Sequence, residues 1–234
     1  MKTLNQFGKI RFVKILMTLI AFVVVFASCS KNDDPDVLTG EAKVMIVNSA
    51  SGSAAQDFYL DNTKVNADAV AYSQSTAYIS TPAGYSRKAE FRDSGSATAN
   101  FTGNLDILPN KNYTFFYTTK ADGTGNSSAV FLDEISSSST TKARVRFVNL
   151  ASGLNSANFL ITGGATLASN VAFGAGSAYS DVDPGTVSLQ TALATGGTAS
   201  VNLGNFTLQA GKIYTLYTSG SLTTTVSAGL ITHN

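Results

Sequence analysis

The apolar and polar residues beyond position 40 follow the short period of β-strands. In residues 143–149, Val145 and Phe147 alternate with Arg144 and Arg146. Successive side chains of a strand point to opposite faces, so the pattern predicts that the two apolar residues lie in a core and the two arginines in water. Similar short runs recur along the chain between turn-forming residues, without a helical period. This spacing predicts an all-β sandwich or barrel.

A long internal repeat divides the same region. Residues 42–48, Ala-Lys-Val-Met-Ile-Val-Asn, match residues 143–149, and the offset of 101 residues then holds without gaps. From Ala42 to Thr114 it yields 20 identities in 73 aligned positions. Chance does not sustain identity at one offset over this length, so the region is a tandem duplication. What both copies keep is expected to be structural, and what only one copy has is the better place to look for function.

The duplication sets the predicted domain boundaries. We expect β-sandwich repeat 1 at residues 41–135, a Ser/Thr linker at 136–141 and β-sandwich repeat 2 at 142–234. The length of each copy suits an immunoglobulin-like sandwich, which has about 100 residues. The expected fold is therefore two tandem immunoglobulin-like antiparallel β-sandwich domains after a signal peptide. The composition of the linker also predicts loose packing of the two copies.

Residues 1–28 have the features of a lipoprotein signal peptide. A basic start precedes an apolar run from Ile15 to Ala27 that is too short to span a membrane. The run leads into Phe-Ala-Ser-Cys29, which resembles the lipobox cut by lipoprotein signal peptidase, although Phe26 stands where Leu is usual. The resemblance implies that Cys29 becomes the lipid-bearing N-terminus. The alternative is a buried free cysteine after an ordinary signal peptide.

Residues 29–40 are polar and acidic, so a flexible tether is expected. Asp33 and Asp34 follow Cys29 closely and resemble the acidic export signal of Bacteroidota surface lipoproteins. The alternative is a solvated linker with chance aspartates. The resemblance implies a protein held in the outer membrane by its lipid and facing the cell exterior, because multiple acyl chains make a stable anchor.

A tyrosine occupies the same place in both copies. Tyr113 and Tyr214 each follow a strand-like run and a tight turn, and each opens the next run. The arrangement resembles the tyrosine corner of Greek-key sandwiches, in which the phenol bonds to backbone just upstream. Two ordinary core tyrosines are the alternative.

These motifs together resemble a known family. The tandem pair, the opening strand, the Lys-x-Tyr-Thr turn and a Tyr followed six residues later by Gly84 or Gly185 are similar to the domain of unknown function 4397, common in Bacteroidota surface lipoproteins. The similarity covers about residues 41–232 and implies fold and location. That family has no established activity, so it implies no catalytic residue.

Residues that carry catalytic chemistry are scarce. The chain has a single histidine, His233, and a single cysteine, the predicted anchor Cys29. Nucleophilic triads and zinc sites need more of these residues, so we expect no enzyme, no cofactor and no bound metal. The oxygen-rich segment from Asp122 to Asn126 lacks the acidic ladder of a calcium loop and is expected to be a hairpin loop.

The charge balance argues against nucleic acid as a partner. The formal net charge is +1, but residues 1–28 carry four basic side chains and no acid. Their removal leaves 12 basic and 15 acidic side chains, a net charge near −3. Binding to phosphates needs a basic surface, which this composition does not supply.

Two tyrosines are candidates for ligand binding. Tyr59 and Tyr85 lie in repeat 1, where repeat 2 has Leu160 and Thr186. Exposed aromatic rings can form platforms for sugars, whereas a partly buried strand tyrosine is the more ordinary outcome.

The sequence favours a non-enzymatic outer-membrane lipoprotein that acts as an interaction or adhesion-type module. A carbohydrate-binding accessory lipoprotein of a glycan-uptake system and a periplasm-facing subunit of an envelope complex are the alternatives. An exposed aromatic row would favour the glycan function, and a large exposed apolar patch would favour the complex. The expected partners are the membrane, through the lipid, and a glycan or protein at the cell envelope.

Overall fold

The structure, a computed structural model, describes residues 38–135, 139–194 and 200–234. In these residues the chain forms sixteen strands and no helix. The described part therefore holds no helix long and apolar enough to cross a membrane. Leu38–Asn234 form one compact unit. The predicted signal peptide, the anchor Cys29 and the tether residues Asp33 and Asp34 lie outside the described residues.

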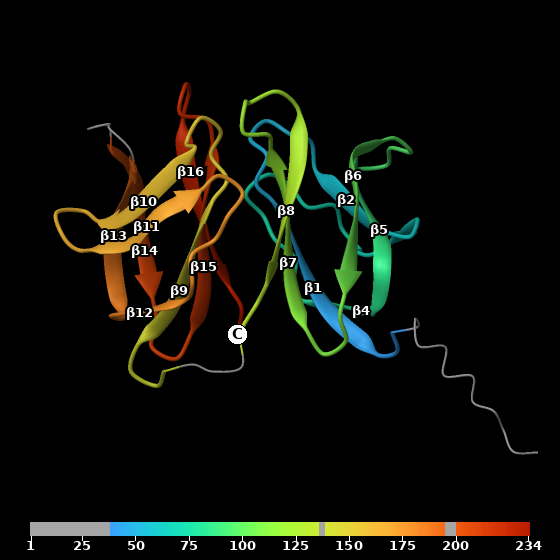
Figure 1. Cartoon of the computed structure of the whole chain (residues 1–234), viewed down its shortest axis with the longest axis horizontal. Helices are drawn as coiled ribbons and strands as arrows, with labels where there is room; N and C mark the ends of the chain where they lie inside the picture. Colours follow the sequence, from blue (N-terminus) through green and yellow to red (C-terminus); the bar gives the residue numbers. More distant parts are fainter. Residues whose placement is uncertain (1–37, 136–138, 195–199) are drawn as a thin grey trace, which may run out of the picture. The chain divides into compact units, whose positions relative to one another are not determined.

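Repeat 1 folds as two four-stranded sheets packed face to face (Figure 1). One sheet has the strand order β4-β1-β7-β8, and the other has the order β3-β2-β5-β6. The strands of this repeat are β1 (Glu41–Asn48), β2 (Gln56–Leu60), β3 (Thr63–Lys64), β4 (Ile79–Pro82), β5 (Gly84–Asp93), β6 (Ala99–Ile107), β7 (Asn112–Thr119) and β8 (Asn126–Leu132).

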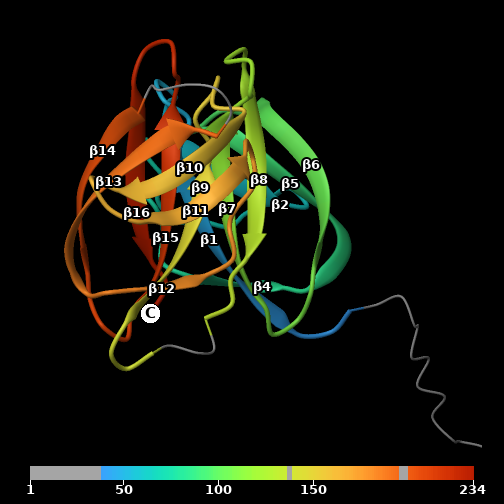
Figure 2. The same ribbon diagram turned by 60° about the vertical axis from the view of Figure 1, so that its left-hand side comes forward.

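Repeat 2 has the same architecture, with sheets ordered β12-β9-β15-β16 and β11-β10-β13-β14 (Figure 2). The main difference is that β11 is a full strand, whereas its counterpart β3 has two residues. The strands of this repeat are β9 (Ala143–Asn149), β10 (Ser156–Ile161), β11 (Thr166–Ala172), β12 (Ser180–Val182), β13 (Gly185–Leu193), β14 (Ser200–Leu208), β15 (Ile213–Gly220) and β16 (Val226–Thr232).

The first strand of each repeat lies beside the seventh and parallel to it. β1 pairs with β7, and β9 pairs with β15 in the equivalent register. The prediction of two tandem all-β sandwiches is confirmed. The strand order differs from that of an immunoglobulin constant domain, whose first two strands share a sheet, because β1 and β2 belong to different sheets here.

Each repeat has its own apolar core between its two sheets. In repeat 1 the Phe58 ring lies 4.9 Å from the rings of both Phe91 and Phe115, measured between centroids. In repeat 2 the rings of Phe147 and Phe159 are 5.2 Å apart. Each such side chain contributes about 1.5–3 kcal/mol through burial alone. The predicted core position of Phe147 is confirmed.

The alignment of the two repeats shifts by one residue in the fifth strand. Phe58 pairs with Phe91, whereas its counterpart Phe159 pairs with Thr191. The expectation of a gap-free offset is therefore wrong here, since the offset is 101 residues at Gly84 and Gly185 but falls to 100 after the irregularity between Gly84 and Arg87 in β5. A bulge at Leu203 then supplies one extra residue and restores the offset in β14. Strand pairing, and not a fixed offset, therefore defines which residues of the two repeats are equivalent.

Both predicted corner tyrosines make the upstream backbone contact. The backbone N–H of Leu108 donates to the phenol oxygen of Tyr113 at 3.1 Å, and that of Gln209 donates to Tyr214 at 3.1 Å. Each donor lies five residues before its tyrosine, and both rings are buried. This is the geometry that the sequence predicts for a tyrosine corner, and it ties the end of one sheet to the start of a strand in the other.

Tyr113 and Tyr117 lie on the same strand but give opposite expectations for removal of the hydroxyl. Tyr113→Phe leaves the Leu108 N–H without its partner, so the free energy of unfolding should fall by about 1 kcal/mol. Among the described residues the buried Tyr117 hydroxyl has no hydrogen-bond partner, and burial raises its pKa to about 12. Tyr117→Phe should therefore leave stability unchanged or slightly higher. Urea unfolding of both variants tests this, and equal losses would contradict the corner.

Candidate functional site

The two repeats meet through a shared apolar cluster, which we call the seam. Its buried members are Met45, Val47, Phe116, Val148, Leu150, Tyr217 and Ile231. Phe116 and Tyr217 occupy equivalent positions, and their rings pack edge to face with centroids 5.2 Å apart. Contact between equivalent residues of two copies is typical of an interface with two-fold symmetry.

The seam corrects two expectations from the sequence. The predicted loose packing is wrong, because Met45 and Val47 of repeat 1 are buried against Val148 of repeat 2. The prediction that Arg146 lies in water is also wrong, because its face of β9 is covered by repeat 1. Arg144 is half-buried, with its guanidinium 5.2 Å from the centre of the Tyr179 ring.

A buried ion pair lies in the seam. Arg146 Nη2 donates to Asp133 Oδ1 at 2.6 Å, and the two side chains are 5% and 0% exposed. Arg146 also donates to Thr215 Oγ1 through Nε and Nη2. The second oxygen of Asp133 accepts bonds from the Tyr78 hydroxyl at 2.8 Å and the Thr114 hydroxyl at 2.7 Å. Both charges are thus paired and hydrogen-bonded, as burial of an ion pair requires.

His233 completes this buried polar cluster. Its Nδ1 lies 2.8 Å from the Tyr78 hydroxyl, and its Nε2 lies 2.8 Å from Thr215 Oγ1. Tyr78 donates to Asp133 and Thr215 accepts from Arg146, so the neutral ring with hydrogen on Nδ1 satisfies every bond. Burial lowers the pKa of His233 to about 4; the Asp133 charge opposes this shift and the Arg146 charge adds to it. Burial also raises the pKa of the Tyr78 hydroxyl.

The sequence identifies His233 only as the single histidine of the chain and does not predict this cluster. Asp133 and His233 are equivalent residues, because each continues the last strand of its repeat and donates its N–H to the start of the seventh strand. Met45 and Arg146 are equivalent in the first strand. The first strands of the two repeats are otherwise similar, but β9 has Arg146 where β1 has Met45. This difference is the signal in the sequence that could have revealed the seam.

The seam encloses Asp133 and His233, a carboxylate and an imidazole of the kinds used in acid–base chemistry. The side chains of Asp133 and His233 have 0% exposure, so a reactant in solvent does not reach them. In residues 38–135, 139–194 and 200–234, no three His, Cys, Asp or Glu side chains gather closely enough to hold a metal ion. The loop between Asp122 and Asn126 is the expected hairpin connection of β7 and β8, with the Thr124 N–H bonded to the Asp122 carboxylate at 2.8 Å.

Gly84 and Gly185 open the fifth strand of their repeats, as the shared motif suggests. Gly185 has a φ of 131°, a conformation that favours glycine. At Gly84 a Cβ atom would lie 2.7 Å from Cδ of Arg87. Gly185 therefore has a backbone reason to be glycine, whereas the contact at Gly84 is with a flexible side chain that can move away.

The two candidate tyrosines do not come together. Tyr85 is 51% exposed near the start of β5. Tyr59 is half-buried in β2, opposite Glu90, and its ring is covered by the Arg92 guanidinium at 4.1 Å from the centroid. These two residues form no joint aromatic platform, so a ligand site at Tyr59 would depend on the residues around that tyrosine.

Tyr59 belongs to a straight row of polar side chains across four strands. Strand pairing sets Lys64 opposite Tyr59, Tyr59 opposite Glu90, and Glu90 opposite Thr102. The row lies on the outer face of the sheet, because the neighbouring residues of β2 and β5 fill the core. We call this surface the Tyr59 face and include in it the flanking residues Asp57, Lys88, Arg92 and Asn104.

Ion pairs organise the charges of the Tyr59 face. Lys64 Nζ lies 2.7 Å from the Asp57 carboxylate. Glu90 lies between two cations, 2.8 Å from Lys88 and 2.6 Å from Arg92. Hydrogen bonds from Lys88 and from Arg92 lower the pKa of Glu90, so the carboxylate stays ionised. The result is a fixed arrangement of charges around one tyrosine.

Repeat 2 has no comparable face. The equivalent row, read from the strand pairing, is Thr166, Leu160, Gln190 and Asn202. None of these residues is charged, although the backbone that carries them has the same topology. The charges are therefore not a requirement of the fold, and they mark repeat 1 as the copy in which function is to be sought.

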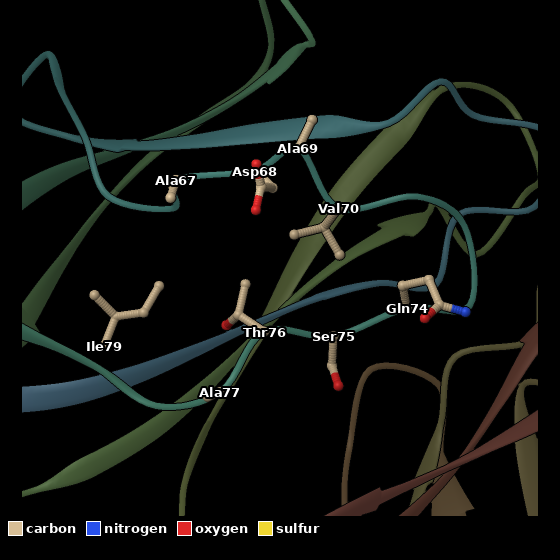
Figure 3. Close-up of a pocket in the computed structure, with 9 residues that line it drawn as sticks. All are labelled: Ala67, Asp68, Ala69, Val70, Gln74, Ser75, Thr76, Ala77 and Ile79. Atoms are coloured by element: carbon tan, nitrogen blue, oxygen red, sulfur yellow. The ribbon is translucent and has the colours of Figure 1, made fainter.

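A second feature of repeat 1 is an open pocket of about 340 Å³ beside β4. Figure 3 shows Val70 and Thr76 facing each other from the two segments that form its walls. Much of the lining is alanine, and Asp68 is its one charged residue. The pocket lies where the chain has left β3 after Lys64, whereas the corresponding β11 continues to Ala172.

The fold and these surfaces define a tandem β-sandwich protein with an enclosed seam and one charged sheet face. The chain belongs to the family described as a domain of unknown function, DUF4397, whose profile matches residues 42–158 and again 152–234. The two matches together span both repeats, so the family resemblance noted in the motifs is confirmed. No curated protein matches the chain.

Proposed function

We propose that this protein is a non-enzymatic lipoprotein of the outer membrane, anchored through Cys29 and facing the cell exterior, where it acts as an interaction or adhesion-type module. The observation that carries a binding rather than a catalytic function is the enclosure of His233. The only imidazole of the chain is bonded to Tyr78 and Thr215 within the seam. The exposed sheet faces and loops are left as the surface for a partner.

The chain direction supports outward presentation of one end of the sandwich. The tether joins repeat 1 at Glu41, where β1 begins. β7 runs parallel to β1, so the loop after Asn48 and the loop after Thr119 both lie at the opposite end. A lipid at Cys29 would therefore hold the start of β1 toward the membrane and leave these loops farthest from it.

Protease shaving of intact cells tests the location. The native protein is expected to be cut, whereas a variant with Asp33→Ala and Asp34→Ala is expected to be protected until the outer membrane is broken. The reason is that these acids form the address in the proposal, while the sandwich does not depend on them. Immunoblotting against repeat 2 before and after lysis gives the readout.

Two controls make the shaving experiment decisive. Cys29→Ser should release the protein from the membrane fraction, because it removes the acyl attachment site. Asp61→Ala changes an exposed aspartate of repeat 1 and should leave shaving unaltered. Protection of the native protein on intact cells would contradict outward orientation.

Three exposed apolar side chains of repeat 1 motivate a second candidate function, that of a periplasm-facing subunit of an envelope complex. Leu108, Val130 and Leu132 are 40%, 39% and 44% exposed. Leu132 pairs with Tyr113, and the Leu108 N–H bonds to the same tyrosine, so two of these side chains flank one residue. Protection of the native protein in the shaving experiment would favour this function.

A further inference from the structure

We propose that the Tyr59 face of repeat 1 binds an acidic glycan, a chain of hydroxylated sugar rings that carry carboxylate or sulfate groups. This inference rests on the proposed function, because it names the partner class of the interaction module. It follows from the shape of the row, the exposure of its charges, the fixed guanidinium of Arg92 and the contrast with repeat 2.

The shape of the row suits an extended ligand. The four residues Lys64, Tyr59, Glu90 and Thr102 sit directly opposite one another on consecutive strands. Three spacings of about 4.8 Å give a row of about 14 Å. A surface of this length fits several linked rings better than a single ion. The row runs across the outer face of the sheet, perpendicular to the strands. A peptide that binds as an added strand would instead pair with the edge of a sheet, so this row does not suit that mode of binding.

The exposed charges of this face are cationic. The side chains of Lys64 and Lys88 are 35% and 43% exposed, whereas those of Asp57 and Glu90 are 5% and 6% exposed. The acids therefore hold the lysines in place while the lysines reach the solvent. Two further acids border the face. The Asp61 carboxylate accepts a bond from the Lys88 N–H, and the Asp93 carboxylate accepts one from the Gln56 amide.

Arg92 holds a partly exposed guanidinium in a fixed position. Its Nη2 donates to Glu90, its guanidinium lies over the Tyr59 ring, and its side chain is 17% exposed. A guanidinium has five N–H donors in a plane, which match the two oxygens of a carboxylate or sulfate. Stacking on Tyr59 fixes that plane before a ligand arrives.

Neutral polar groups complete the chemistry that a sugar needs. Thr102 lies in the row and Asn104 pairs with Lys88, and both are exposed on β6. Hydroxyl and amide groups donate to and accept from ring hydroxyls. The face lacks the apolar anchors that dominate protein–protein interfaces, since its exposed members are charged or polar. These features favour a glycan over a folded protein as the occupant.

Repeat 2 offers the internal comparison. Leu160, Gln190 and Asn202 replace Tyr59, Glu90 and Thr102 on the same strands. Because the backbone arrangement is shared, the difference between the two faces lies in side-chain chemistry alone. The inference therefore predicts one glycan site per chain, located in repeat 1.

Isothermal titration calorimetry of the purified protein with a panel of oligosaccharides tests the inference. The panel holds oligogalacturonate, a sulfated chondroitin oligosaccharide, neutral maltohexaose and polyglutamate, an acidic chain without sugar rings. At least one acidic oligosaccharide is expected to bind, with an affinity that falls as salt is added, because the contacts are between charges. Lys88→Gln or Arg92→Gln should weaken binding by about tenfold or more, since each removes a charge-assisted hydrogen bond.

Matched variants separate loss of contact from loss of fold. Lys88→Gln changes an exposed side chain whose ion pair contributes little to stability. The variant should therefore have the same unfolding temperature as the native protein. Gln190→Ala in repeat 2 and Lys111→Gln outside the face should bind as the native protein does. The inference would be overturned if maltohexaose or polyglutamate bound as tightly as the acidic oligosaccharides. It would also be overturned if Lys88→Gln bound them as the native protein does, or if neither acidic oligosaccharide bound at millimolar concentration. None of these outcomes bears on the shaving result, so location and ligand fail separately.

Discussion

Asp133→Ala is expected to lower the free energy of unfolding by about 3–5 kcal/mol. The substitution leaves the Arg146 guanidinium buried in the seam without its counter-ion, because the rest of the cluster around it is neutral. It also removes the acceptor of the Tyr78 and Thr114 hydroxyls. Urea unfolding at pH 7.5, followed by tyrosine fluorescence, measures the change.

Two further variants isolate the ion pair. Glu134→Ala alters the adjacent exposed acid and should change stability by no more than about 0.5 kcal/mol. Asp133→Ala combined with Arg146→Met removes both charges. Position 146 of repeat 2 then carries methionine, as the equivalent Met45 of repeat 1 does. Because an apolar pair can replace a buried ion pair at little cost, the double variant should recover most of the loss. A loss below about 1 kcal/mol for Asp133→Ala would contradict the described pairing.

Acidification is expected to destabilise the protein through His233 by about 2 kcal/mol between pH 7.5 and pH 5. Burial lowers the pKa of the folded-state imidazole from 6.5 to about 4. Above pH 6.5 neither the folded nor the unfolded state binds the proton. Between pH 6.5 and 4 only the unfolded state binds it, so stability falls as the pH falls through this window. The total loss reaches about 3 kcal/mol once the folded state is protonated too.

His233→Gln gives the comparison for this measurement. Glutamine does not titrate, and its amide can still bond to Tyr78 or Thr215. The carboxylates titrate in both proteins, so the difference between the two stability curves reports His233. The native curve should fall more steeply from pH 7 to pH 5, and parallel curves would show that the imidazole does not stay neutral in the folded seam.

The fold was largely predictable because the two copies confirm each other's core. Phe58 and Phe159 recur at the same place, and their alternation with polar neighbours follows from the two faces of a strand. Burial of Arg146 could not be predicted in this way. A sheet face covered by a second domain shows the same period of two as a face in water, so the period identifies two faces without saying what covers each one.

The candidate site was predictable only in part. Comparison of the copies singled out Tyr59, because repeat 2 has Leu160 in its place. Its partners Glu90 and Arg92 come from β5, about thirty residues further along the chain, and only the pairing of β2 with β5 brings them to Tyr59. The one-residue shift in β13 also hid the true equivalents, since a fixed offset aligns Glu90 with Thr191 instead of Gln190.

The buried ion pair records the order of events in the history of this chain. The seam joins equivalent positions of two copies, as the interface of an ancestral homodimer would. In a dimer of first repeats, Asp133 would face Met45 twice, and in a dimer of second repeats Arg146 would face His233 twice. Neither arrangement supplies an acid and a base to each other. Only two copies that mutate independently can place Asp133 of one copy against Arg146 of the other, so gene duplication came before the charge pair, and the charge pair made the two halves no longer interchangeable.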